Sequence, residues 1–85
     1  MFNIEAIKKL ISNQLDCIKG LEKQGNTYTK YVNGSKVNIH ITQIHCQVFR
    51  DSYHEENFRI NAQHDFKNAE LHATYIVGQI KKHLD

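Results

Sequence analysis

The chain has 85 residues, of which 40% are hydrophobic and 24% charged, and its formal net charge is +2. This length suits one α+β domain over residues 1–85, and the mild charge argues against a strongly basic nucleic-acid-binding surface. Two cysteines are too few for a disulfide framework, and no apolar run approaches the roughly 20 residues that cross a bilayer. We therefore expect a cytoplasmic protein with reduced thiols and no membrane partner.

The first predicted element is an amphipathic helix that begins at an Asn3 cap and extends to about residue 21. Its apolar residues recur at steps of three and four, which is the spacing of one helical stripe. A single stripe is typical of a helix that packs on one side against a sheet. The residues of this stripe are Ile4, Ile7, Leu10, Ile11, Leu15, Ile18 and Leu21.

A β-hairpin is predicted next, from two alternating runs at 26–32 and 35–41 that flank Asn33-Gly34. This dipeptide is the strongest short-range signal for a type I′ turn, because both of its residues tolerate positive φ. The register of such a turn places Tyr28 opposite Ile39 on the core side of the sheet.

The pattern of inward-facing residues changes phase after the hairpin. Apolar residues occupy odd positions from Val37 to Ile41 and even positions from Ile44 to Val48. We interpret this change as a β-bulge or bend at Thr42-Gln43 within one long middle strand. Each neighbouring strand would then pair with only half of it, so either another chain pairs with the free edges or loops and a helix cover them.

A polar connection over 51–56 precedes the third predicted strand, in which Phe58, Ile60 and Ala62 alternate with polar residues. Asp65 then caps a second helix that carries Leu71 and Tyr75 away from its apolar stripe. The predicted order is α-β-β-β-α, a three-stranded antiparallel meander. Because only one sheet face is apolar, both helices should cover that face and leave the other open.

Motifs for metal, cofactor or catalytic chemistry are weak. The histidines lack the short paired spacings of zinc sites, and the isolated glycines form no phosphate-binding loop. The 51–56 segment combines acids, an imidazole and a phenol, but a two-layer domain offers little depth for a pocket. We expect no enzyme activity, no metal and no cofactor.

These observations favour a non-enzymatic protein-interaction module that binds a larger protein, or itself as a homodimer, through a free strand edge and the polar sheet face. The size and composition also suit a small inhibitor, such as an anti-defence protein of a phage or mobile element. The predicted partner-binding residues are Tyr31, Lys36, His40, His45, Gln47, Phe49, Tyr53, His54, Arg59, Leu71 and Tyr75.

The alternative function is weak nucleic-acid binding through lysines of the first helix and the hairpin. Residues 1–50 are more basic than residues 51–85, which would orient a polyanion. Affinity for a nucleic acid would fall steeply with added salt, whereas an ordinary protein interface need not respond so strongly. The lysines concerned are Lys8, Lys9, Lys19, Lys23, Lys30 and Lys36.

Overall fold

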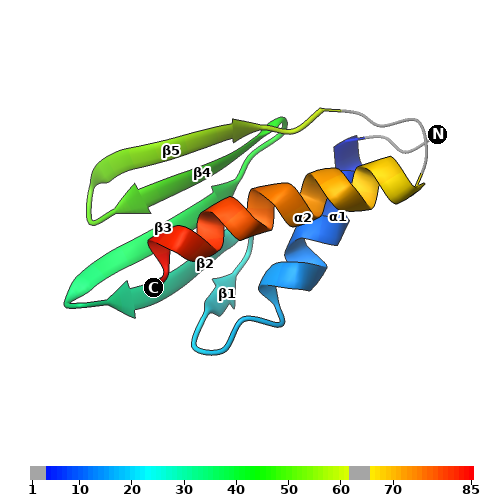
Figure 1. Cartoon of the computed structure of the whole chain (residues 1–85). Coiled ribbons are helices and arrows are strands. Elements are labelled where there is room, and N and C mark those ends of the chain that lie inside the picture. The colour runs from blue at the N-terminus through cyan, green and yellow to red at the C-terminus, as the bar shows by residue number, and fades with distance from the viewer. Residues whose placement is uncertain (1–3, 62–65) are drawn as a thin grey trace.

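The computed structural model describes residues 4–61 and 66–85, which form two helices and a five-stranded antiparallel sheet (Figure 1). Each strand pairs with the next along the chain. The predicted α+β class is confirmed, whereas the predicted three-stranded meander is wrong, because the sheet has five strands. The elements are α1 (Ile4–Leu15), β1 (Glu22–Gln24), β2 (Thr27–Val32), β3 (Ser35–Ile41), β4 (His45–Arg50), β5 (Tyr53–Arg59) and α2 (Phe66–His83).

The β2–β3 hairpin has the predicted turn and register. Asn33 and Gly34 have φ angles of 52° and 84°, as a type I′ turn requires. Tyr28 pairs with Ile39, and both side chains are buried. Local turn chemistry therefore determines this part of the sheet.

The long middle strand of the prediction is instead two strands, β3 and β4, that fold back on each other. The backbone N–H of Thr42 donates to the carbonyl oxygen of His45 at 2.8 Å, and the N–H of His45 donates to Thr42 Oγ1 at 3.0 Å. The reversal pairs Ile41 with Cys46. This reversal accounts for the change from odd to even inward positions without a bulge at Thr42-Gln43. The two strand edges that were expected to be free, one on β3 and one on β4, pair with each other.

The last strand, β5, begins earlier than predicted. Asp51 has a φ of 55° in a tight turn, and the strand starts at Tyr53 rather than at residue 57. A register shift lies between Val48 and Phe49, so a β-bulge does occur, but in the β4–β5 ladder. Beyond this bulge, Phe58 pairs with Cys46.

The first helix is shorter than its apolar stripe. α1 ends at Leu15, after which the N–H of Ile18 donates to the carbonyl oxygen of Leu15 at 3.0 Å in a tighter turn. Ile18 and Leu21 still pack against the core from this connection. Gly20, with a φ of 85°, turns the chain into β1. No strand was predicted at the position of β1.

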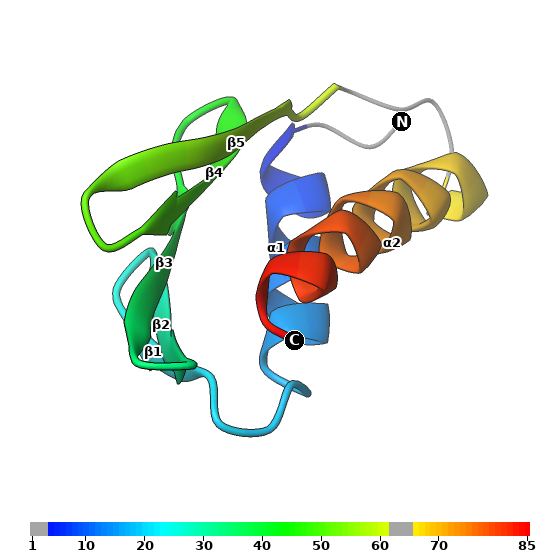
Figure 2. The same ribbon diagram turned by 60° about the vertical axis from the view of Figure 1, so that its left-hand side comes forward.

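Both helices cover one face of the sheet, and the opposite face is open (Figure 2).

The predicted cap Asp65 and the predicted strand residue Ala62 lie outside the described residues. Neither α1 nor α2 combines the length and hydrophobicity needed to cross a membrane, as judged over the described ranges. The buried core contains Ile7, Ile11, Leu15, Tyr28, Val32, Val37, Ile39, Ile41, Cys46, Val48, Ile60, Ala69, Ala73, Ile76, Val77, Ile80 and Leu84.

Candidate interaction surface on the open sheet face

The open face consists of rows of polar and aromatic side chains that run across the strands. The ladder registers place residues of neighbouring strands side by side, and alternation turns these residues away from the helices. One row contains Thr29, Asn38, Phe49 and His54, and the next contains Thr27, His40, Gln47 and Asn57. These rows bring together four predicted site residues, His40, Gln47, Phe49 and His54, which are up to 14 positions apart in the chain.

Three rings form a cluster across β3, β4 and β5 on this face. The rings of Phe49 and His54 stack with centroids 4.7 Å apart at 22°, and His40 meets Phe49 edge-on at 5.1 Å. His54 Nε2 donates to the carbonyl oxygen of Glu56 at 2.9 Å, because a carbonyl can only accept. The imidazole of His54 is thereby oriented, and it covers one face of the Phe49 ring.

Charges on the open face are sparse and mostly positive. Lys36 lies opposite Tyr31 in the β2–β3 ladder near one end of the sheet. Arg59 lies opposite His45 in the β4–β5 ladder near the other end. Tyr31 is 70% exposed. Glu22 of the edge strand β1 lies opposite Thr29, so it adds a carboxylate to the row that contains Phe49 and His54. The surface can thus offer hydrogen-bonding amides and imidazoles, exposed rings and two separated cations.

The segment 51–56 does not bring its acids and imidazole to one point. The Oδ1 atom of Asp51 accepts from the backbone N–H of Lys36 at 3.0 Å, at the end of β3. Glu55 lies on the helix side, where its Oε1 is 3.2 Å from both Arg50 Nε and His83 Nδ1. His54 faces the opposite side of the sheet. Asp51 and Glu55 therefore make contacts that link this segment to β3 and to the end of α2.

Two cations of the covered sheet face hold the end of α2, which the sequence analysis missed. Arg50 Nη2 donates to the carbonyl oxygen of His83 at 2.9 Å, and Lys30 Nζ donates to that of Leu84 at 3.4 Å. Lys30 and Arg50 share one inward-facing row with Val37. The sequence does contain a signal for this role, because the alternation of the strands places Lys30 and Arg50 on the covered side of the sheet. A charged side chain on that side must reach a carbonyl or a carboxylate.

The lysines of the nucleic-acid alternative do not form one track. Lys8 pairs with Glu5 on α1 at 3.3 Å, and Lys23 Nζ lies 5.7 Å from the Tyr28 ring centroid on the helix side. Lys30 caps α2, whereas Lys36 lies on the open face. Lys9 and Lys19 are exposed on α1 and on the turn that follows it.

The cysteine and histidine side chains of the described residues also lie apart from one another as potential metal ligands. Within residues 4–61 and 66–85, no three His, Cys, Asp or Glu residues are grouped as metal ligands. Burial raises the pKa of the Cys46 thiol to about 12, and Cys17 is exposed after α1. A neutral, buried thiol is a poor ligand and a poor nucleophile.

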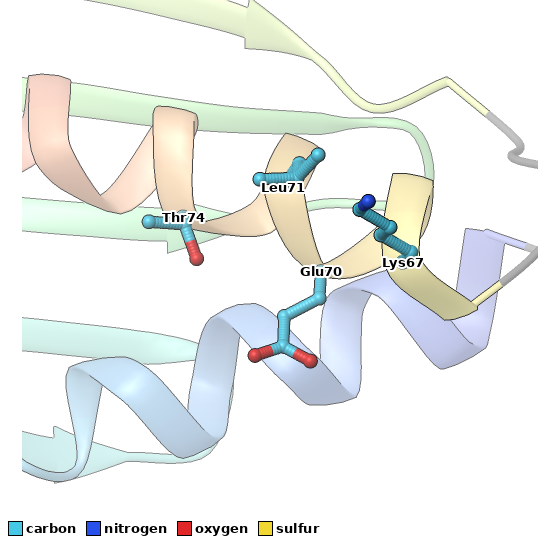
Figure 3. A pocket seen from close by; sticks show the side chains of 4 residues that line it. All are labelled: Lys67, Glu70, Leu71 and Thr74. Atoms are coloured by element: carbon cyan, nitrogen blue, oxygen red, sulfur yellow. The ribbon is translucent and has the colours of Figure 1, made fainter.

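Three further predicted residues lie away from the open face. Leu71 and Tyr75 are 59% and 61% exposed on the outer side of α2, behind the sheet. Leu71 also borders a shallow pocket of about 270 Å³ near the start of this helix (Figure 3). Tyr53 is exposed at the first position of β5, beside the β4–β5 turn.

Comparison with known proteins identifies no relative. The chain has no significant match to a family model, a curated protein or a solved structure.

Proposed function

We propose that this chain is a non-enzymatic protein-binding module that docks on a larger protein through its open sheet face. The observation that carries the proposal is the ring cluster of His40, Phe49 and His54, which spans β3, β4 and β5 on the uncovered face of the sheet. Aromatic residues and arginine are enriched at protein interfaces, and anchors near the centre of an interface contribute most of its affinity. We assign Phe49 the role of such an anchor because it contacts both other rings of the cluster, and Tyr31 and Arg59 extend the surface around it.

A protein partner suits this surface better than single-stranded nucleic acid. Base stacking needs an accessible ring face, but His54 already covers one face of Phe49 with the rings 4.7 Å apart. A polyanion also needs a continuous cationic groove, whereas Lys36 and Arg59 belong to distant strand ends. Ring edges surrounded by amides instead favour contacts with peptide groups and apolar side chains.

The sheet face carries the binding in this proposal more than the strand edges. β1 is three residues long, and β5 presents Glu55, Glu56 and Arg59 beside a bulge. Short edges, charged residues and bulges are devices that prevent another strand from adding to a sheet. The free edges therefore contribute at most to the rim of the interface.

A module that covers part of a larger protein excludes other ligands from that area. Small inhibitors act in this way, including anti-defence proteins of phages and mobile elements, and inhibition is the mode of action that we propose. Binding should depend on the ring cluster and be tolerant of salt, because few of the contacting groups are charged.

Photo-crosslinking from two exposed tyrosines tests this proposal. Benzoylphenylalanine at Tyr31 lies on the open face, and the same residue at Tyr75 lies on α2 behind the sheet. In cells that produce the chain, the Tyr31 probe should capture one larger protein, and the additional change Phe49→Ser should abolish that capture. Equal capture of this protein from position 75, or capture of nucleic acid alone from position 31, would contradict the proposal.

A further inference from the structure

The outward side of α2 carries a stripe that the core does not use. Leu71, Tyr75, Gly78 and Lys82 follow one another at steps of four, three and four residues and are all exposed. At 100° per residue these positions lie opposite the buried Ala73 and Ile80. Such spacing is that of a helix–helix seam.

Gly78 is the unusual member of this stripe. It lies in the interior of α2, where glycine destabilises a helix relative to alanine. A Cβ atom added there would meet nothing within 4 Å, and its φ is not among the positive values of the chain. Neither crowding nor backbone conformation within the described residues explains a glycine here. A bare backbone on an exposed helix does allow an outside group to approach closely.

We infer that a second copy of this chain docks on this stripe, with the two α2 helices antiparallel. A two-fold axis near the middle of the stripe places Tyr75 of each copy on Gly78 of the other, and Leu71 on Lys82. Each Tyr75 ring then packs on a glycine and each Leu71 on a flexible lysine stem, and every contact occurs twice, as a two-fold axis requires. Antiparallel helices also bring opposite ends of their macrodipoles together.

The pocket beside Leu71 supplies the matching charge. Its described lining is Lys67, Glu70, Leu71 and Thr74, with a volume of about 270 Å³ (Figure 3). In the antiparallel register, the alkyl stem of Lys82 from the second copy lies along Leu71 and its ammonium reaches the Glu70 carboxylate. A lysine that packs its stem on apolar surface while its charge is paired is a common arrangement.

α2 lies on the helical side of the sheet, opposite the open face (Figure 2), and the stripe is on the exposed side of this helix. A dimer formed through α2 would leave both open faces uncovered, so it could hold two partner molecules. This valency rests on the proposed function, whereas the α2 contact does not. A monomeric variant should still bind its partner at a ratio of one to one.

Sedimentation equilibrium of the full chain tests the contact, from about 10 μM to about 1 mM, the range in which a weak interface populates. The molar mass should rise from 9.9 kDa towards twice that value. Gly78→Gln should raise the melting temperature of the monomer yet weaken association at least tenfold, because its side chain occupies the place of the Tyr75 ring. Asn13→Gln on the exposed side of α1 is the matched control and should leave association unchanged.

Charge exchange tests the register. Glu70→Lys or Lys82→Glu alone should weaken association, and the double variant should restore it. A wild-type chain that stays at 9.9 kDa throughout would overturn the inference. So would a dimer that Gly78→Gln leaves intact, or one that Phe49→Ser on the sheet face disrupts.

Discussion

Arg50 and His83 join the sheet to the end of the last helix: the guanidinium donates from Nη2 to the carbonyl oxygen of His83 at 2.9 Å. Arg50 also pairs through Nε with Glu55 at 3.2 Å, and Glu55 contacts the His83 ring. One arginine thus satisfies a helix C-terminus and orders the β4–β5 hairpin beneath it.

Replacing Arg50 by methionine should therefore destabilise the fold. The change keeps the apolar stem and removes both polar contacts, so we expect a loss of about 1–2 kcal/mol after allowance for partial exposure. Urea unfolding followed by circular dichroism measures the change. Arg59→Met on the exposed face is the control, with an effect within about 0.5 kcal/mol. Equal losses in the two variants would show that the Arg50 contacts are not stabilising.

Acid should weaken the junction between β5 and α2. The backbone N–H of Asn61 donates to His72 Nε2 at 3.2 Å, and desolvation by burial lowers the pKa of His72 below its usual 6.5. The unfolded chain therefore binds this proton first, so the stabilisation is complete above pH 6.5 and is lost as the pH falls below it. Unfolding free energies of the wild type and His72→Gln, compared across this range, should converge on acidification. A constant difference would contradict the assignment.

The turn at Asp51 combines backbone strain with a hydrogen bond, and three substitutions separate them. Asp51→Asn keeps tolerance of the 55° φ and an acceptor for Lys36 N–H, whereas Asp51→Gly keeps only the tolerance. Asp51→Ala loses both and should cost about 1–2 kcal/mol. Melting temperatures should fall in the order Asn, Gly, Ala. An alanine variant as stable as the asparagine variant would disprove this account of the turn.

The two thiols should differ in reactivity. Cys17 is exposed, whereas burial raises the pKa of Cys46 to about 12 and leaves it protonated. A thiol reagent should modify one cysteine in the folded chain and two after denaturation, with Cys17→Ser abolishing the fast reaction. Rapid modification of Cys46 in the folded chain would show that the core opens more readily than the packing implies.

Much of the secondary structure follows from local sequence. Asn33-Gly34 determines its hairpin because two residues that accept positive φ leave one favourable turn, and the turn sets the register. The phase change after Ile41 is also visible in the sequence. A bulge and a tight reversal shift the phase equally, however, and only the pairing of Ile41 with Cys46 distinguishes them.

Other features depend on the assembled sheet. β1 has neither apolar residues nor alternation, and it forms because the edge of β2 offers backbone partners to Glu22–Gln24. The sequence alone placed His40 and Phe49 on the open face, but it left His54 in a loop. Contact between His54 and Phe49 follows from the bulged β4–β5 register. The sequence thus determines which side chains avoid the core, because the alternation along a strand is a local property. The pairing of the strands in the tertiary structure decides which of these side chains meet, because the register between strands depends on residues that are distant in the chain.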